Sequence, residues 1–294
     1  MTQEWTHIPI MAPEIAELLL LNPSGVYVDG TLGLGGHSKY FLSHLAADAR
    51  ILGFDKDEEA LKMAQEKVAD ARLTAYHKSY TQAPEVLKSL GLEGADGALF
   101  DLGLSSYQLD NPARGFSIMG NGPLDMRFDL QNPLSAAVIV NTWPMAELER
   151  ILKDYGEERN HTKIALAIMQ ARKEAPIETT EQLKNIVESV CPRYGKNHPA
   201  TQTFQALRIA CNQELQTVET VLNSLGGIVR IGGRAAVLTF HSLEDRLVKT
   251  HFKMLAKTGN WKLINKHALA PSFEEVRQNR RARSAKLRVI ERVN

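Results

Sequence analysis

The chain has few cysteines and no long hydrophobic run. Cys191 and Cys211 are the only cysteines among 294 residues, and neither lies in a metal-binding or disulfide-framework spacing. This usage predicts a reducing compartment, hence the cytoplasm. No run of about 18 apolar residues is present, and no basic cluster precedes the apolar residues of the N-terminal stretch. The sequence therefore predicts neither a membrane span nor a secretory signal.

The chain also carries almost no net charge, but its charges are unevenly distributed. The formal net charge is +1, and hydrophobic and charged residues make up 44% and 23% of the chain. These proportions are those of a globular protein and exclude a disordered, collagen-like or disulfide-scaffold chain. Residues 1–104 hold 8 Lys and Arg against 15 Asp and Glu, whereas residues 215–294 hold 15 against 6. The basic end predicts contact with a polyanion, although a solvated basic face would give the same counts.

Apolar runs alternate with amphipathic stretches in the first third of the chain. The runs are typical of buried strands and lie at residues 26–29, 51–55, 73–77 and 97–102. Helical periodicity fills the segments between them, and the first of these helices is expected to run from Ser38 to Ala47. This β-α-β-α order predicts a parallel sheet with helices on both faces.

A different pattern interrupts this order in the middle of the chain. Residues 105–135 are rich in Gly, Pro, Asn and Asp, which predicts a long structured loop, and helical periodicity follows. We therefore predict an inserted, mainly helical substrate-recognition domain at 105–214. Residues 1–104 and 215–294 are expected to form one discontinuous domain around the sheet.

The last part of the chain is expected to return to the sheet. One long helix is predicted over residues 200–225, a fifth strand over 234–240 and a further helix over 243–257. Residues 261–265 and 285–293 are expected to close the sheet as an antiparallel pair.

A glycine-rich loop, DGTLGLGGHS at residues 29–38, directly follows the first predicted strand. Glycines let the backbone turn sharply and approach a ligand closely, and ligands of open α/β sheets lie beyond the carboxyl ends of the strands. Asp55 ends the next strand, where a carboxylate can accept hydrogen bonds from two ribose hydroxyls. The structural alternatives are a tight turn for the loop and a helix cap for Asp55.

S-adenosylmethionine suits this loop better than a nucleotide does. The P-loop pattern is absent, and the dinucleotide pattern is not met, because Gly33-Leu34-Gly35 is followed by Gly36-His37-Ser38. S-adenosylmethionine carries a ribose but no phosphate, so it needs close approach and a carboxylate rather than an anion cradle. The expected closing strand pair also suits a methyltransferase sheet better than a dehydrogenase sheet.

A second polar segment, DLGLSSYQLD at residues 101–110, follows the fourth predicted strand. Asp101 is therefore expected on the same edge of the sheet as Gly35 and Asp55. A carboxylate there can bind the cofactor or accept a hydrogen bond from a substrate amine, and Gln108 offers both a donor and an acceptor. An ordinary strand-end turn is the alternative.

Further motifs occur in order over nearly the whole chain. They are His7 to Ile10 with Glu14, RGFS (114–117), GPLDMRFD (122–129), YGEER (155–159), HPATQTFQALRIACNQEL (198–215), FHSLEDRLVK (240–249) and ARSAKLR (282–288). Together with the two polar segments, they resemble the bacterial small-subunit ribosomal RNA cytosine-N4 methyltransferase family, RsmH, also called MraW. The resemblance implies an α/β fold, a class I S-adenosylmethionine-dependent methyltransferase (Rossmann-like) sheet with an inserted helical domain.

The resemblance also implies an activity and a set of cofactor contacts. The family transfers a methyl group from S-adenosylmethionine to the exocyclic N4 of a cytidine in the decoding region of 16S rRNA, in the small ribosomal subunit. The positions of this sequence that match the family's cofactor contacts are Gly35, Gly36, His37, Asp55, Tyr80, Asp101 and Gln108. Tyr80 stands where the family usually has Phe. Neither a metal nor a membrane partner is expected, and a homodimer is left open.

The chemistry of the target amine suggests roles for further residues. The N4 lone pair of cytosine is delocalised into the ring, so an acceptor that holds one N–H improves the nucleophile. Asp101 is the candidate, with pure cofactor binding as its other role. Methylation at C5 would instead need a cysteine nucleophile, and neither cysteine follows a predicted strand. Arg280, Arg281, Arg283 and Lys286 are candidates for binding RNA phosphates.

Aromatic residues and one histidine complete the candidates. Phe116, Trp143 and Tyr155 can stack on an unstacked target base, although core packing suits Trp143. His241 ends the fifth predicted strand on the same edge, or belongs only to a helix-entry turn capped by Ser242. Two other functions stay open. One is a nicotinamide-dependent oxidoreductase on a similar sheet, and the other is an RNA-binding assembly factor that keeps only the cofactor fold.

Overall fold

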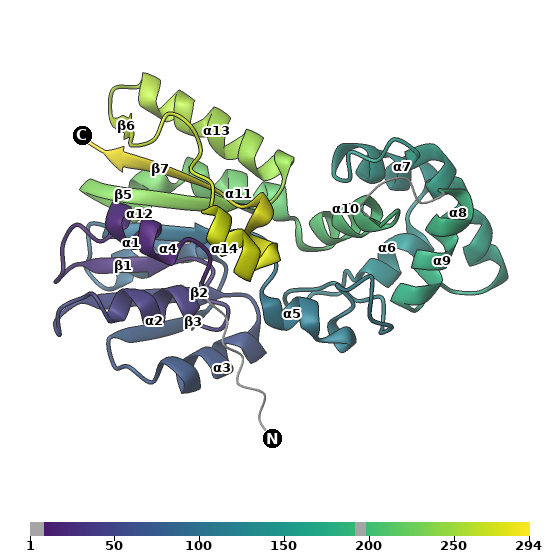
Figure 1. The fold of residues 1–294 in the computed structure, drawn as a ribbon, viewed down its shortest axis with the longest axis horizontal. Coiled ribbons are helices and arrows are strands. Elements are labelled where there is room, and N and C mark those ends of the chain that lie inside the picture. The colour runs from purple at the N-terminus through teal and green to yellow at the C-terminus, as the bar shows by residue number, and fades with distance from the viewer. Residues whose placement is uncertain (1–8, 192–197) are drawn as a thin grey trace. The chain divides into compact units, whose positions relative to one another are not determined.

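The computed structural model describes residues 9–191 and 198–294, so the predicted motif at His7 begins outside the described residues. The chain divides into two compact units. The first comprises residues 1–103 and 215–294, and the second comprises residues 104–214. In Figure 1 the sheet and its helices are coloured from purple to blue in the first part of the chain and from green to yellow in the last part.

The first unit is built on a seven-stranded sheet with the order β3-β2-β1-β4-β5-β7-β6 (Figure 1). The strands are β1 (Val26–Asp29), β2 (Arg50–Asp55), β3 (Leu73–His77), β4 (Ala95–Asp101), β5 (Val229–Thr239), β6 (Trp261–Leu263) and β7 (Lys286–Arg292). The first five strands run parallel, and β7 pairs antiparallel with β5 and β6. The predicted α/β fold class, with its Rossmann-like sheet and closing antiparallel pair, is confirmed.

Helices cover both faces of this sheet. They are α1 (Ala12–Leu19), α2 (Gly36–Leu42), α3 (Glu58–Val68), α4 (Ala83–Ser89), α11 (Glu214–Asn223), α12 (Leu225–Ile228), α13 (Ser242–Lys257) and α14 (Phe273–Gln278), with 3-10 turns η1 (Tyr80–Gln82) and η3 (Arg280–Ser284). Successive strand residues point to opposite faces, so Val28 and Phe100 lie in one core and their neighbours Tyr27 and Leu99 in another. Burial on both faces explains why these strands are continuous apolar runs in the sequence.

The second unit is helical around a core of its own. Its helices are α5 (Ser106–Asp110), η2 (Pro112–Arg114), α6 (Ala136–Thr142), α7 (Met145–Asp154), α8 (His161–Glu174), α9 (Thr180–Val190) and α10 (Thr201–Asn212). Helices α6 to α10 all contribute apolar residues to the core. The loop predicted over residues 105–135 contains α5 and η2 at its start, so only residues 115–135 form the expected structured loop. Arg127 fixes it by pairing with Asp125 at 2.7 Å and by donating to the carbonyls of Leu130 and Asn132 at 2.9 and 2.7 Å.

The single helix predicted over residues 200–225 is wrong. Helix α10 ends at Asn212, and α11 begins at Glu214, because Gln213 between them adopts a left-handed backbone with φ of 51°. A residue in this conformation cannot continue a right-handed helix and commonly ends one. The boundary between the two units falls at this break.

Two further elements begin or end elsewhere than predicted. Helix α2 stops at Leu42, short of the expected end at Ala47. Strand β5 begins at Val229 rather than at the expected Arg234, so it includes Gly232 and Gly233. Its register against β4 shifts between Ala95 and Gly97. Such an irregularity lets a strand continue through residues that do not fit the pleat. None of the described helices combines the length and the apolar character that crossing a bilayer requires.

Candidate active site

Three acidic residues end neighbouring strands at one edge of the sheet. Asp29, Asp55 and Asp101 are the last residues of β1, β2 and β4, and β1 lies between the other two strands. Asp29 pairs with Gly53 and Leu99, so the two outer strands each run two residues past β1. The strand order reverses here, and open α/β sheets bind their ligands at such a switch point.

The glycine-rich loop after β1 lies in this recess and is bonded to both outer strands. The N–H groups of Gly30 and Leu32 donate to backbone carbonyls of β4 and β2 at 2.8 and 2.9 Å. The N–H of Gly33 donates to the carboxylate of Asp55 at 2.7 Å. The hydroxyl of Thr31 accepts a backbone N–H of β4 at 2.7 Å. The backbone N–H groups of Gly30, Leu32 and Gly33 are therefore bonded to the sheet.

The packing of the loop requires a glycine at position 35. Its φ of 75° lies in the left-handed region, and a Cβ at this position would be 2.5 Å from Val68 Cγ2 and 3.4 Å from Ala64 Cβ. The loop thus contacts helix α3 through the glycine. At Gly36, the first residue of α2, a Cβ would meet Pro9 at an ordinary 3.4 Å.

Asp29 braces the loop from within the protein. This residue is 2% exposed. Its Oδ2 accepts the hydroxyl of Ser38 at 2.7 Å, and its Oδ1 accepts the N–H of Thr31 at 3.3 Å. Burial raises the pKa of its carboxyl group, although these hydrogen bonds oppose the shift. The sequence shows that Asp29 is acidic but not that it bonds to Ser38, because this bond forms only when α2 begins at Gly36.

Asp55 has both carboxylate oxygens at the edge of the loop. Oδ2 accepts the N–H of Gly33, and Oδ1 accepts the N–H of Asp57 at 2.9 Å. The cap of helix α3 is Asp57, which accepts from Glu59 and Ala60, so the helix-cap alternative for Asp55 is wrong. Burial raises the pKa of Asp55 to about 6. Each carboxylate oxygen can accept more than one hydrogen bond, so Asp55 remains able to receive ligand hydroxyls.

His37 and Asp101 meet above the middle of the sheet. His37 is the second residue of α2 and is 7% exposed. Its Nε2 lies 3.4 Å from Oδ2 of Asp101. Within the described part of the chain, neither ring nitrogen of His37 has a hydrogen bond, and nor does the buried Oδ1 of Asp101. The structure therefore brings these two predicted residues together with unused polar atoms.

Tyr80 lies beside the start of the same loop. Its ring packs edge-on against Phe100 with centroids 5.5 Å apart, and a Cβ on Gly30 would be 3.1 Å from its own Cβ. The hydroxyl of the preceding Ser79 instead caps the turn by accepting the N–H of Thr81. Tyr80 is thus the aromatic side chain that follows β3 at the carboxyl edge of the sheet.

Gln108 belongs to the second unit, whereas the other six predicted cofactor contacts belong to the first. It forms a capping box at the start of α5. Its Oε1 accepts the N–H of Ser105 at 3.2 Å, and its own N–H donates to the hydroxyl of Ser105 at 3.2 Å. The capping box accounts locally for part of the DLGLSSYQLD motif.

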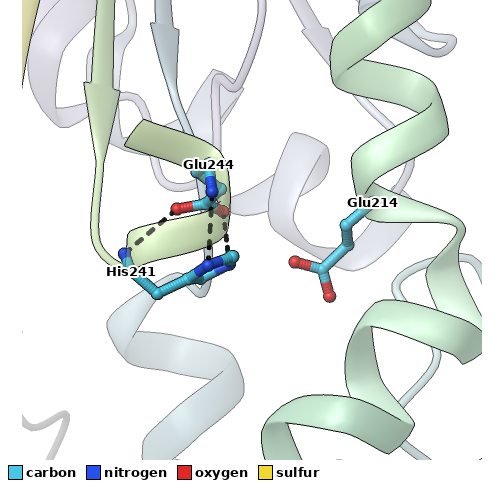
Figure 2. A group of neighbouring side chains, drawn as sticks. All are labelled: Glu214, His241 and Glu244. Carbon is cyan, nitrogen blue, oxygen red and sulfur yellow. Dashed lines mark hydrogen bonds and ion pairs between the residues drawn. The ribbon is translucent and has the colours of Figure 1, made fainter. Parts of the chain in front are cut away.

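His241 is itself the cap of helix α13, in place of the expected Ser242. Its Nδ1 accepts the N–H of Glu244, and the buried carboxylate of Glu244 accepts the N–H of His241 at 3.4 Å (Figure 2). The same carboxylate accepts the N–H of Phe240 at 2.9 Å. Figure 2 also draws Glu214, a residue of the second unit that pairs with Arg208 at 2.8 Å. The helix-entry role is confirmed, with His241 rather than Ser242 as the cap.

The basic candidates lie at the start of β7, which pairs with the end of β5. Arg280, Arg281 and Arg283 are exposed on η3. Lys286 pairs with Thr239 in the sheet, which places it at the carboxyl edge of the parallel strands. Its side chain lies 3.2 Å from Asp245.

The aromatic candidates for base stacking are used elsewhere. Phe116 is 5% exposed and stacks on Phe128 with centroids 5.7 Å apart, so its predicted role is wrong. Trp143 and Tyr155 are half-buried and pack against the core of the second unit. Core burial, which satisfies large apolar rings, explains all three placements.

Substitution of Gly35 tests the packing of the loop. Gly35→Ala should lower the free energy of unfolding by about 2–4 kcal/mol, because left-handed strain and a steric overlap add. Gly91→Ala is the matched control, since Gly91 has a similar φ of 70° but no atom within 4 Å of a Cβ. It should lose only about 1–2 kcal/mol. Urea unfolding measures both, and equal losses would show that the contact with α3 is loose.

Comparison with known proteins identifies the family. The chain matches the MraW methylase family over residues 4–293. A relative named ribosomal RNA small subunit methyltransferase H, from Elusimicrobium minutum (strain Pei191), is 57% identical over 98% of this chain and 99% of its own. A protein of the same name from Geobacter sp. (strain M21) is 42% identical over 99% of this chain and 100% of its own.

A solved rRNA methylase from Streptococcus thermophilus covers 96% of this chain and 94% of its own with 12% identity and a TM-score of 0.40, a likeness too low to bear on function. The family match and the two relatives extend along nearly the whole sequence. This chain therefore belongs to the MraW methylase family.

Proposed function

We propose that this chain transfers a methyl group from S-adenosylmethionine to the exocyclic N4 of a cytidine in the decoding region of 16S rRNA, in the small ribosomal subunit. The names of its relatives support a small-subunit rRNA substrate. The observation that carries the proposal is the edge of the sheet where Asp55, His37 and Asp101 surround a loop with its donors already bonded. The choice of N4 follows from the resemblance of the motifs.

The loop favours a cofactor without phosphates. An anion cradle needs free backbone N–H groups, but those of Gly30, Thr31, Leu32, Gly33 and Gly35 donate to protein acceptors. S-adenosylmethionine has no phosphate, and its ribose hydroxyls need an acceptor such as Asp55. This argues against the nicotinamide-dependent alternative.

The remaining cofactor contacts are assigned by position in the sequence. Gly35, Gly36 and His37 join the loop to α2, and Tyr80 presents an aromatic ring at the same edge. Gln108 lies in the second unit, for which we propose substrate recognition, and is assigned as a cofactor contact only by its match to the family motif. Methyl transfer from a sulfonium needs no metal, because the positive charge on sulfur is lost as the methyl group leaves.

Asp101 is the proposed acceptor for the target amine. It ends β4 at the switch point, and its buried Oδ1 has no hydrogen-bond partner among the described residues. By holding one N–H of N4, this oxygen would free the lone pair for attack on the methyl carbon. Alignment of nitrogen, carbon and sulfur supplies several kcal/mol more.

Both cysteines argue against methylation at C5, which needs a thiolate. Burial raises the pKa of Cys211 to about 12, and it also raises the pKa of Cys191. Both thiols are buried, and neither forms a disulfide. A buried neutral thiol is a structural residue rather than a nucleophile.

Radiolabelled methyl transfer to small subunits from a strain that lacks this enzyme tests the proposal. Nucleoside analysis should find the label in N4-methylcytidine. Asp101→Asn should lower kcat by about 100-fold or more, with cofactor affinity nearly unchanged. Asp48→Asn, an exposed aspartate of the same unit, is the control and should behave as wild type.

Other outcomes of this assay would favour the alternatives. Binding of NADH but not of S-adenosylmethionine would indicate an oxidoreductase. Cofactor binding without transfer to small subunits would indicate an assembly factor. A loss of cofactor affinity in Asp101→Asn that accounts for the whole loss of activity would reduce Asp101 to a cofactor contact.

Cofactor affinity should depend on pH through Asp55. Because the pKa of Asp55 is raised to about 6, this carboxylate gains a proton as the pH falls through that value and loses acceptor capacity. The dissociation constant of S-adenosylmethionine should therefore rise by up to about tenfold between pH 7 and pH 5. Asp55→Asn should bind weakly at every pH, with a flat profile. Calorimetric titration measures both, and an unchanged wild-type affinity would contradict the assignment.

The basic residues of η3 should make the affinity for RNA depend on salt concentration. Replacing Arg280 and Arg283 by Ala should reduce the slope of log K against log salt by about 0.7 for each lost phosphate contact. Arg277→Ala is the matched control, since Arg277 already pairs with Glu274 at 2.9 Å. Its slope should stay near that of wild type. Equal slopes in all three proteins would exclude η3 from the RNA interface.

A further inference from the structure

The two strand-end aspartates that flank His37 differ in how their oxygens are used. Each of the two oxygens of Asp29 accepts a hydrogen bond from within the protein, one from Ser38 and one from Thr31. Asp101 has only the long contact from Oδ2 to Nε2 of His37, at 3.4 Å, and its Oδ1 has no hydrogen bond within the described part of the chain. Asp29 is thus a structural acid, whereas Asp101 is only half engaged.

Unbonded buried polar atoms are costly, and natural proteins keep few of them. Here three occur together: both ring nitrogens of His37 and Oδ1 of Asp101. Leaving a buried polar group without a hydrogen bond destabilises the folded state. Such a cluster persists where a ligand completes the bonding. A contact of 3.4 Å is also long for a hydrogen bond, and catalytic contacts often tighten only when the reactants are bound.

The surroundings hold His37 in place against Asp101. His37 follows Gly36 at the start of α2, whose next residue, Ser38, is bonded to Asp29. The imidazole ring of His37 interacts electrostatically with the carboxylates of Asp29 on β1 and Asp101 on β4. On the other side, the backbone N–H of Asp101 donates to Thr31 of the loop at 2.7 Å. Both partners are therefore fixed at the backbone by the same loop.

We propose that His37 is a positioning residue for the transfer: its Nε2–H donates to Oδ2 of Asp101 and so aims Oδ1 at the exocyclic amine of the target base. This inference rests on the proposed function. In the step, the N4 lone pair forms the bond to the methyl carbon, and the electron pair of the carbon–sulfur bond passes to sulfur, which leaves as a neutral thioether. One N4 proton passes to Oδ1 of Asp101. His37 thus acts on the amine through Asp101, in addition to the cofactor contact that its place in the loop implies.

Three variants test this role by separating kcat from cofactor binding. With saturating S-adenosylmethionine, His37→Ala should lower kcat by about 10- to 100-fold, as loss of an orienting partner does at metal sites, a loss separate from any change in the dissociation constant of the cofactor. His37→Gln keeps an N–H donor and should recover part of kcat. His44→Ala is the control, because His44 follows the same helix, is exposed, and bonds through its ring to Tyr40 and Ser43.

A double substitution supplies the decisive comparison. If His37 works through Asp101, adding His37→Ala to Asp101→Asn should lower kcat no further, because effects of residues that act as a unit are not additive. Independent, multiplying losses would overturn the proposal. So would a His37→Ala variant whose lost activity is wholly a loss of cofactor affinity, or whose kcat is unchanged. Absence of methyl transfer by the wild-type chain would instead refute the proposed function itself.

Circular dichroism and thermal unfolding show whether each variant is folded. If His37→Ala fails to fold, the comparison of His37→Gln with His37→Asn replaces it as the test. A His37→Gln variant that keeps part of kcat beside an inactive His37→Asn, whose shorter side chain cannot reach Asp101, would support the proposal. Equal activity of the two would overturn it.

Discussion

A difference of two residues in strand length organises the site. Strand β1 stops at Asp29, while its neighbours β2 and β4 continue to Asp55 and Asp101. The loop that follows β1 enters the recess and bonds to both neighbours, with Gly33 on Asp55 and Thr31 on the backbone of β4. The loop, two acidic residues and the start of α2 are thereby fixed relative to one another, and every proposed contact of the first unit depends on this arrangement.

The same bonds decide which ligand chemistry suits the loop. Backbone donors bonded to the sheet cannot receive a phosphate, so the recess offers carboxylate acceptors in place of an anion cradle. Burial raises the pKa of Asp55, whose two oxygens are already held by N–H groups. Among three neighbouring aspartates, the number of satisfied oxygens distinguishes the brace at Asp29 from the reactive candidate at Asp101.

Helix caps with similar local sequences form different hydrogen bonds in this structure. Ser105 and Gln108 form a complete box, and His241 with Glu244 form another. Ser272 and Glu275 have the same spacing, but the carboxylate of Glu275 accepts the N–H of Met11 at 2.8 Å, at the start of α1. The spacing of Ser or Thr and Glu or Gln three residues apart predicts a helix cap, because each side chain bonds to a backbone N–H within the same turn. It does not reveal that a partner 264 positions away competes for the same oxygen.

The sequence by itself determined the parallel strands, the inserted helical segment, the glycine loop and the acidic strand ends, because hydrophobic periodicity and strand-end polarity are local properties. It misjudged the helix over 200–225, since the left-handed backbone at Gln213 leaves no local signal. It also gave Phe116 a surface role that core packing against Phe128 excludes. Only the tertiary structure decided that Gly35 packs on α3 and that His37 faces Asp101, because such contacts join segments whose separation in the chain carries no record of their distance in space.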